Sequence, residues 1–140
     1  KFLGDGILAS FGAVAPSTTA AADALRAADA VIEAADRWAA ERTAAGRQPL
    51  SIGLAVASGR VVFGAVGDAE RLEFTVIGDA VNFAAKLEKH NKDEHTRALV
   101  DGSTYAKAEQ QGYIAPARRE RRPGRKVGGV ADLVDIVVLA

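Results

Sequence analysis

The sequence predicts an α+β domain in which a sheet is covered by helices, and two observations favour this class over a doubly wound parallel fold. Short β-type runs are joined by glycine-containing turns, which is typical of antiparallel hairpins. Two long segments with helical periodicity, residues 17–45 and residues 79 to about 91, interrupt these runs. Nothing repeats at a fixed period, so a solenoid is excluded.

The first segment, KFLGDGILASFG at residues 1–12, predicts a β-hairpin. Asp5 lies between Gly4 and Gly6, and apolar runs flank this turn on both sides. A turn residue needs no further function. An exposed carboxylate at a hairpin tip also suits a hard cation such as Mg²⁺, usually together with a second carboxylate and substrate phosphates.

The segment 17–45 carries the clearest helix pattern. Leu25, Ala28 and Ile32 recur at helical spacing, a Ser-Thr-Thr run precedes them as a possible cap, and Gly46 ends the pattern. We therefore expect one face of this helix to pack against the core.

The middle of the chain predicts three strands. Two β-type runs, residues 50–57 and 60–66, are expected to form a hairpin that turns at Ser58-Gly59. A loop is expected from Gly67-Asp68, and the third run covers residues 72–77.

The remaining elements are a long helix, a short helix and two strands. Asp79 is a natural N-cap for the long helix, and Ser103 is the expected cap of the short helix at residues 103–111. The strands are expected at residues 97–100 and 134–139.

Composition bounds the class of protein. A chain of 140 residues with 49% hydrophobic and 26% charged residues is long enough for one domain with a real core. Eighteen basic and eighteen acidic residues cancel, so global charge gives no case for nucleic acid or an anionic membrane as partner. The absence of cysteine excludes disulfides and thiolate metal sites and fits a reducing compartment.

No apolar run approaches the roughly 20 residues that span a bilayer, so this domain itself is expected to make no membrane contact and to be cytoplasmic. The chain begins at Lys1, without methionine and inside a patterned segment. We therefore expect an N-terminally incomplete domain, residues 1–140, of a longer protein that could carry a membrane anchor elsewhere.

Two polar clusters are interpreted as solvated surface. Residues 118–126 (RRERRPGRK) carry six cations but lack the interleaved aromatic residues of a nucleic-acid surface, so a solvated loop is expected. His90 and His95 could be imagined as metal ligands, and a solvated helix end is the preferred interpretation.

The stretch TVIGDAVNFAAKLE at residues 75–88 carries the sharpest signal. Ala80, Phe83, Ala84 and Leu87 fall on one apolar face of a helix, and the opposite stripe holds Asn82, Lys86 and Lys89. Asparagine is a poor helix-interior residue, so its place in the first turn favours a local or ligand hydrogen bond. An amide one turn from a cation suits a phosphate or a developing oxyanion.

Three motifs occur in order: KxxGDG at residues 1–6, IGLAVASGRVVFG at 52–64 and RLEFTVIGDAVNFAAKLE at 71–88. Together they resemble the catalytic domain of class III nucleotidyl cyclases, the adenylate and guanylate cyclases, over nearly the whole chain. The resemblance implies a ferredoxin-like palm, a central antiparallel sheet with helices on one face. It also implies a head-to-tail homodimer whose active sites cross the interface.

The resemblance further implies a role for each matching residue. Asp5 corresponds to the second of two aspartates that bind two Mg²⁺ or Mn²⁺ ions, the first of which would precede Lys1. Lys1 matches the lysine that reads the adenine edge, and Thr75 its partner position. Asn82 matches the asparagine that positions the ribose. Guanylate cyclases usually carry Glu and Cys at the two base-reading places, so this pair argues for ATP.

The chain departs from the family pattern at Lys86, where the family has its transition-state arginine. Lysine keeps the charge but loses the planar fork that contacts two phosphate oxygens at once. The triphosphate-binding cation of the family lies before the last strand, where Arg125 and Lys126 are candidates.

The resemblance therefore predicts an adenylate cyclase that forms cyclic AMP and pyrophosphate from ATP by two-metal catalysis at a homodimer interface. Two alternatives stay open. One is a degenerate or weakly active cyclase homology domain that senses nucleotide and dimerises, and the other is a guanylate cyclase.

Overall fold

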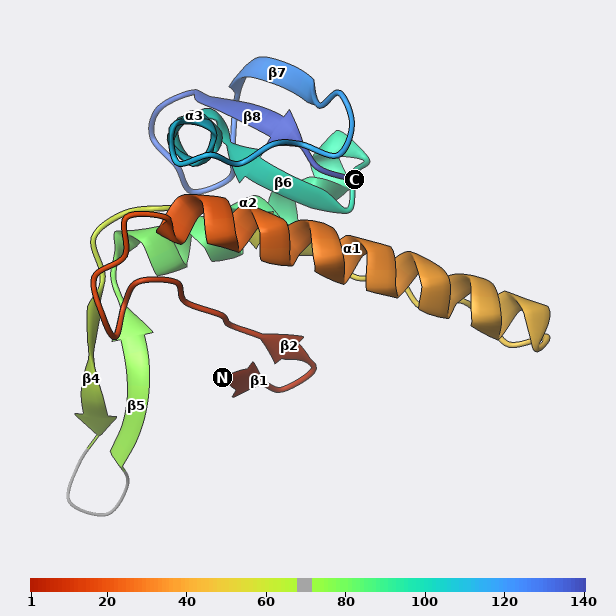
Figure 1. Ribbon diagram of the computed structural model, residues 1–140, viewed down its shortest axis with the longest axis horizontal. Coiled ribbons are helices and arrows are strands. Elements are labelled where there is room, and N and C mark those ends of the chain that lie inside the picture. The colour runs from red at the N-terminus through yellow and green to blue at the C-terminus, as the bar shows by residue number, and fades with distance from the viewer. Residues whose placement is uncertain (68–71) are drawn as a thin grey trace.

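The computed structural model describes residues 1–67 and 72–140, and it has the predicted α+β architecture (Figure 1). Its elements, in chain order, are β1 (Phe2–Leu3), β2 (Gly6–Ile7), α1 (Ala20–Ala44), β3 (Leu54–Val56), β4 (Val62–Gly67), β5 (Leu72–Ile77), α2 (Asp79–Glu94), β6 (Ala98–Asp101), α3 (Gly102–Gln110), β7 (Glu120–Arg125) and β8 (Val134–Val138).

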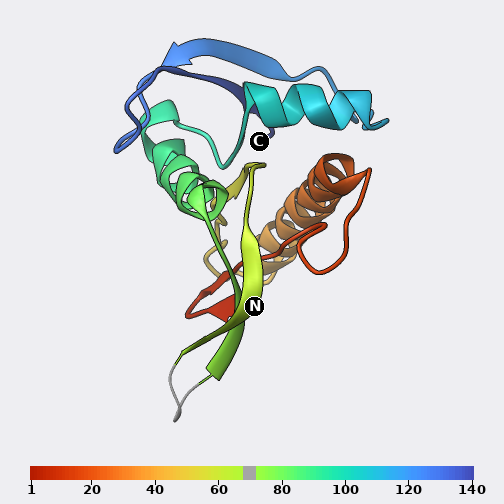
Figure 2. The ribbon, with the colours of Figure 1, turned by 90° about the vertical axis from the view of Figure 1, so that its left-hand side faces the viewer.

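The main sheet has four strands in the order β3-β6-β8-β7. The β6–β8 and β8–β7 pairs are antiparallel, as predicted, whereas β3 runs parallel to β6. Two further antiparallel ladders, β1–β2 and β4–β5, form separate two-stranded sheets. The β4–β5 hairpin extends away from the four-stranded sheet (Figures 1 and 2).

Helices cover both faces of the main sheet, which corrects the expectation of helices on one face. All four residues of β6 are buried, and successive side chains of a strand point to opposite faces. Ala98 and Val100 belong to the core cluster shared with α1 and α3, whereas Leu99 packs with Leu87 of α2 and Ile136 of β8. Because β6 is buried on both faces, other elements must cover each face. Figure 2 shows α2 and α3 on opposite sides of this strand.

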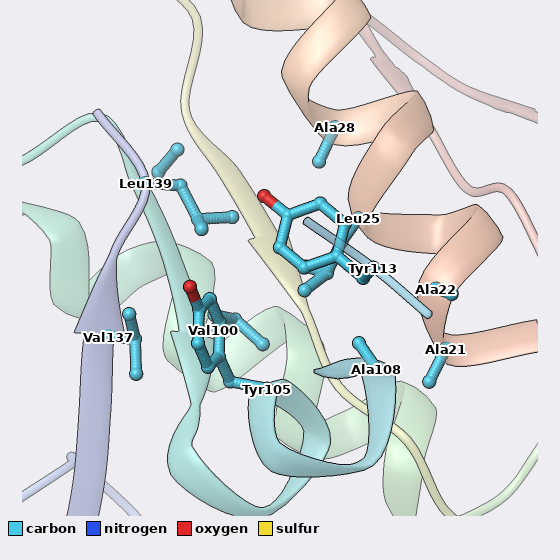
Figure 3. Packing of buried hydrophobic residues seen from close by; sticks show 11 residues of the cluster. Ala21, Ala22, Leu25, Ala28, Val100, Tyr105, Ala108, Tyr113, Val137 and Leu139 are labelled. Carbon is cyan, nitrogen blue, oxygen red and sulfur yellow. The ribbon is translucent and has the colours of Figure 1, made fainter. Parts of the chain in front are cut away.

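The larger core lies between β6, α3 and the start of α1 (Figure 3). Tyr113 closes this core, because its hydroxyl donates to Asp29 Oδ2 of α1 at 2.7 Å. Burial, reinforced by the Asp29 carboxylate, raises the pKa of Tyr113 to about 12. Arg119 donates to the Asp29 carboxylate and to the Leu139 carbonyl oxygen, so this arginine joins α1 to the end of the chain.

Only the first part of α1 is fully buried, although Ile32 packs against the core and Asp36 pairs with Arg97 at 2.6 Å. Its buried residues all lie between Ala21 and Ala28, and the rest of the helix projects beyond the sheet (Figure 1). Thr19 is the N-cap residue, but its side chain accepts no hydrogen bond from the backbone of the helix; its hydroxyl donates instead to Asp23 Oδ2 at 2.7 Å. Gln111 takes that place, because its Oε1 accepts from the backbone N–H groups of Ala21 and Ala22 at 2.8 and 3.1 Å.

The predicted hairpin at Ser58-Gly59 is wrong. Ser58 is instead fixed to α3, since its backbone N–H donates to Thr104 Oγ1 at 2.8 Å and its hydroxyl accepts from Thr104 Oγ1 at 3.0 Å. The chain then leaves the main sheet, and β4 pairs with β5 along its full length, from Val62↔Ile77 to Gly67↔Leu72. The loop expected from Gly67-Asp68 lies outside the described residues from Asp68 onward.

Two helix caps fall one or two residues before the predicted ones. The N-cap of α2 is Gly78, not Asp79; its φ is 156°, and a Cβ there would lie 2.6 Å from the Arg60 carbonyl oxygen, so glycine is required. The N-cap of α3 is Asp101, not Ser103. Its Oδ1 accepts from the Thr104 N–H at 2.9 Å and from the Ser103 hydroxyl.

Residues 118–126 are not the expected solvated loop, because β7 occupies most of this segment and pairs with β8. The register shifts between Arg122 and Arg125, around Pro123, which is where an edge strand tolerates proline. Charged side chains on an edge strand also protect it from pairing with other chains.

Asn91→Ala should destabilise the fold by about 2–3 kcal/mol. Asn91 is buried, donates to the Leu54 and Glu88 carbonyl oxygens at 3.0 Å each, and accepts from the Thr96 hydroxyl at 2.9 Å. Alanine removes all three of these part-buried hydrogen bonds. Urea denaturation measures the loss, with the exposed neighbour substitution Lys92→Ala as control, expected within about 0.5 kcal/mol of wild type. A loss for Asn91→Ala no larger than the control's contradicts this account.

Candidate active site

Asp5 lies in the turn between β1 and β2, at the predicted hairpin tip, with its side chain exposed. Among the residues described, no hydrogen bond or ion pair engages its carboxylate. The predicted tip placement is therefore correct, and the carboxylate is available to a cation. The metal role itself stays a prediction.

Lys1 lies against β5. Its Nζ donates to Glu73 Oε2 at 2.5 Å, and its terminal amino group donates to the Leu8 carbonyl oxygen at 2.9 Å. Glu73 and Thr75 are two residues apart on β5, so their side chains share a face, and both residues are half-buried. The ion pair therefore holds Lys1 along the face of β5 that carries Thr75.

Thr75 pairs with Gly64 of β4. Directly opposite residues of an antiparallel pair point to the same side. A Cβ built on Gly64 would meet nothing within 4 Å, so the face next to Thr75 is open. A flat ligand edge could approach the Thr75 hydroxyl here, with Lys1 held on the same face.

The polar stripe of α2 has the predicted orientation. Asn82 and Lys86 are exposed, whereas Leu87 is buried and Phe83 is half-buried on the other side. The stripe faces the segment between β7 and β8, because Lys86 Nζ donates to the Gly129 carbonyl oxygen at 2.5 Å.

The fit of Lys86 to this segment depends on glycine. Gly129 has a φ of 74°, and a Cβ there would lie 3.2 Å from Lys86 Cε. The lysine side chain therefore lies directly over the β7–β8 loop, residues 126–133, in a contact that only a residue without a side chain accommodates easily.

The two candidate triphosphate cations are held differently. Lys126 Nζ donates to the Ala131 carbonyl oxygen at 3.2 Å, within the same loop that Lys86 contacts. Arg125 Nε instead pairs with Glu94 Oε1 at 3.3 Å, at the C-terminal end of α2. The structure thus brings Lys86 and Lys126 to one loop and directs Arg125 away from it.

The predicted site residues fall into two groups. Lys1, Asp5 and Thr75 lie on or next to the β1–β2 and β4–β5 hairpins, whereas Asn82 and Lys86 lie on α2, where Lys86 contacts the β7–β8 loop. In the described part of the chain, no hydrogen bond or ion pair connects a residue of the first group to one of the second. We call these the hairpin group and the α2 group.

The residues described contain no cluster of three or more His, Asp and Glu side chains that could hold a metal ion. The unpaired carboxylate of Asp5 fits one ligand of a hard cation that takes oxygen ligands.

Sequence reasoning missed His90, which is not at a solvated helix end. It is 5% exposed, with Nδ1 3.1 Å from Asp93 Oδ2 and Nε2 3.1 Å from Glu94 Oε1. The signal was present in the spacing, since acids three and four residues after a histidine share its helix face. His95 is exposed, as expected.

Among the residues that the structure describes, no helix combines the length and apolar character needed to cross a bilayer.

Comparison with known families and proteins gives a consistent result. The family model described as the adenylate and guanylate cyclase catalytic domain matches residues 1–123. Adenylate cyclase 1 of Rhizobium meliloti is 31% identical over 137 residues, covering 98% of this chain and 20% of that protein. Adenylate cyclase of Anabaena cylindrica is 36% identical over 107 residues, covering 74% and 20%. The chain thus spans about a fifth of the length of these relatives.

Solved structures are similar in fold. The guanylyl cyclase Cya2 superposes with a TM-score of 0.76 at 26% identity, covering 99% of this chain and 66% of that one. The adenylyl cyclase CyaB from P. aeruginosa superposes with a TM-score of 0.72 at 20% identity, covering 93% and 64%.

Proposed function

Because this chain belongs to the adenylate and guanylate cyclase catalytic domain family, we propose that it converts ATP to cyclic AMP and pyrophosphate. The observation that carries the choice of nucleotide is the ion pair that holds Lys1 on the face of β5 bearing Thr75. Relatives and structural neighbours include both adenylate and guanylate cyclases, so the choice rests on these two side chains.

The hairpin group reads the base. The Thr75 hydroxyl donates and accepts, and the Lys1 ammonium only donates, so together they match an edge with an acceptor nitrogen beside an amino group. Adenine has such an edge. Guanine places a carbonyl and an N–H on the corresponding edge, where a carboxylate would be the better partner for the N–H. The open face over Gly64 leaves room for the ring.

In the reaction, the ribose 3′-oxygen forms a bond to the α-phosphorus while the bond from that phosphorus to the bridging oxygen breaks. Pyrophosphate leaves, and the hydroxyl proton passes to water. Two Mg²⁺ or Mn²⁺ ions, one bound in part by Asp5, would supply Lewis-acid chemistry at the hydroxyl and the leaving group. The exposed, unpaired Asp5 carboxylate supports this assignment.

The α2 group acts on the sugar and the phosphates. Asn82 orients the ribose through its amide, and Lys86 neutralises charge at the α-phosphate. Lys86 exchanges its single bond to the Gly129 carbonyl for a phosphate oxygen. Because this contact is exposed to solvent, breaking it costs little free energy. Lys126 provides a second cation at the same loop.

A homodimer would bring the two groups together, with the hairpin group of one chain facing the α2 group of its partner. The hairpins carry exposed apolar side chains that a partner could cover, with exposed fractions of 81% for Phe2, 73% for Ile7, 72% for Val62 and 71% for Phe74. Apolar surface of this kind marks interaction sites. Two-fold symmetry would create two such sites in one dimer.

A second candidate is a cyclase homology domain that binds nucleotide and dimerises with little turnover. Lys86 favours it, because a lysine stands where the family has arginine and its amine is already bonded to Gly129. The two candidates differ in the rate of cyclic nucleotide formation and agree in nucleotide affinity.

The assigned base readers predict a preference for ATP over GTP in the full-length protein. Lys1→Glu should reduce the ATP-to-GTP ratio of kcat/KM by about 10–100-fold, because a donor at the base edge becomes an acceptor. Steady-state assays with each nucleotide measure the ratio. Lys107→Glu, an equal charge change on exposed α3, is the control and should leave it unchanged. Equal kcat/KM for ATP and GTP in the wild type contradicts the assignment.

A further inference from the structure

The polar stripe of α2 continues beyond the proposed site. Asn82, Lys86, His90 and Glu94 follow one another at intervals of four residues, and residues four apart are neighbours on a helix surface. The first two are exposed, whereas the side chains of His90 and Glu94 are only 5% and 9% exposed. The buried half of the stripe has no part in the function proposed above.

The surroundings of His90 fit its doubly protonated form. Each ring nitrogen lies 3.1 Å from a carboxylate oxygen, one on Asp93 and one on Glu94. A neutral imidazole has one N–H and one lone pair, so one of the two carboxylates would face a lone pair. Only the imidazolium donates to both.

The charges around His90 balance only when it is protonated. From β7, Arg122 Nη1 donates to Glu94 Oε2 at 2.9 Å, and Arg125 Nε pairs with Glu94 Oε1 at 3.3 Å. Glu120 in turn binds Arg122, and these contacts with Glu120 and Glu94 raise the pKa of the Arg122 guanidinium, which stays charged.

From β3, β6 and β8, Ala55, Leu99 and Ile136 belong to the apolar cluster around Leu87, one turn before Asn91 on α2. The charged cluster comprises three acids, two arginines and the histidine. Proton loss from His90 would leave two cations against three carboxylates; the cost falls on Glu94, whose side chain is 9% exposed, because Asp93 and Glu120 are open to solvent.

This cluster joins α2 to β7, and α2 also contacts the loop that follows β7, through Lys86 and Gly129. Arg122 donates to the Glu94 carbonyl oxygen as well, at 2.7 Å, so the end of α2 is attached through both main chain and side chain. His90 lies between the two attachments along the helix and orients the Glu94 carboxylate. Whatever shifts Glu94 also shifts β7 and the loop that follows it.

We propose that protonated His90 is a positioning residue that holds α2 and the β7–β8 loop in register for phosphate binding, so that nucleotide turnover weakens when His90 loses its proton. This inference rests on the proposed function for its effect on turnover, and on geometry alone for the protonation of His90. Loss of the proton removes one of the two ring N–H donors, so one of the two carboxylates loses its hydrogen bond to His90.

The test compares the full-length wild type with His90→Gln and with His95→Asn, which removes the exposed neighbouring imidazole as a control. At about pH 6, kcat of His90→Gln should be on the order of tenfold lower than wild type, with little change in the KM for ATP. The ratio of wild-type to variant kcat should approach one at about pH 8.5. Comparing ratios cancels the pH dependence of the chemistry itself. His95→Asn should follow the wild type throughout.

Glu94→Gln serves if His90→Gln does not fold, because its amide accepts from or donates to a neutral imidazole and should abolish the pH-dependent ratio. Ring ¹⁵N spectra report on His90 without an activity assay. The His90 signal is the one that is lost in His90→Gln and kept in His95→Asn. Near neutral pH it should show both ring nitrogens protonated. The affinity for inorganic tripolyphosphate tests the effect on phosphate binding. It should decrease as the pH rises, in parallel with the ratio of wild-type to variant kcat. A singly protonated His90, or kcat and tripolyphosphate ratios independent of pH, overturns the inference. Absence of cyclic AMP with a pH-dependent tripolyphosphate affinity overturns only the proposed function.

Discussion

Asp5→Ala and Asn82→Ala chains should each lose turnover by at least about 10³-fold, and mixing them should restore a part of it. Asp5 belongs to the hairpin group and Asn82 to the α2 group, and no contact links them within the described residues of one chain. In a head-to-tail heterodimer of the two variants, one active site carries both substitutions and the other carries neither. Random mixing then yields about a quarter of the wild-type activity, because half the dimers are mixed and each has one intact site.

The control for this experiment is a mixture of Asp5→Ala with a Thr75→Val chain. Both substitutions lie in the hairpin group, so no heterodimer contains an intact site and no recovery is expected. Cross-linking or light scattering establishes that heterodimers form. Heterodimers without recovered activity in the first mixture contradict a site shared between two chains.

Substitution of Lys86 should change kcat in both directions. Lys86→Ala should lower kcat by about 10²-fold, as loss of a transition-state donor usually does. Lys86→Arg should raise it by about tenfold, because a guanidinium contacts two phosphate oxygens where an ammonium contacts one. The KM for ATP should change little in either variant, since the interaction belongs to the transition state.

The structure sharpens this prediction through the Gly129 contact. Lys86 is bonded to the Gly129 carbonyl before substrate binds, so Gly129→Ala, which introduces a Cβ 3.2 Å from Lys86 Cε at a φ of 74°, should displace the lysine and lower kcat as well. Lys89→Ala, an exposed cation on the same helix, is the matched control and should have no effect. Unchanged kcat in both Lys86 variants removes Lys86 from the chemistry.

The elements with strong local signals could be predicted from the sequence. The β-type run at residues 72–77, the helical periodicity in 79–91 and the glycine-flanked Asp5 each identified the right element in the right place. These signals are local because hydrogen bonding and side-chain periodicity within one element produce them.

Strand partners could not be predicted in the same way. The turn-like Ser58-Gly59 suggested a hairpin, but Ser58 is bound to Thr104, which lies 46 residues further along the chain, and β3 pairs with β6. The arginine-rich β7 shows no apolar alternation because it is an edge strand, held by its backbone pairing with β8 and by the Arg122–Glu94 ion pair. Both outcomes depend on contacts distant in sequence.

The roles of the candidate site residues stay predictions, and their arrangement could be predicted only in part. The order of motifs identified Lys1, Asp5, Thr75, Asn82 and Lys86, and their orientations agree with strand and helix periodicity. The attachment of Lys86 to Gly129 and the pairing of Arg125 with Glu94 were not predictable, because the β7–β8 loop has no periodic pattern. The pairing of Glu94, the partner of His90, with Arg122 and Arg125 of β7 was likewise not evident from the sequence.

The most direct test of the account is product analysis with the full-length protein, ATP and either Mg²⁺ or Mn²⁺. Chromatography and a pyrophosphate assay should find cyclic AMP and pyrophosphate in equal amounts, and Asp5→Ala should abolish both products together. ADP and phosphate as products, or no cyclic AMP while ATP binds, would contradict the claim that this domain cyclises ATP.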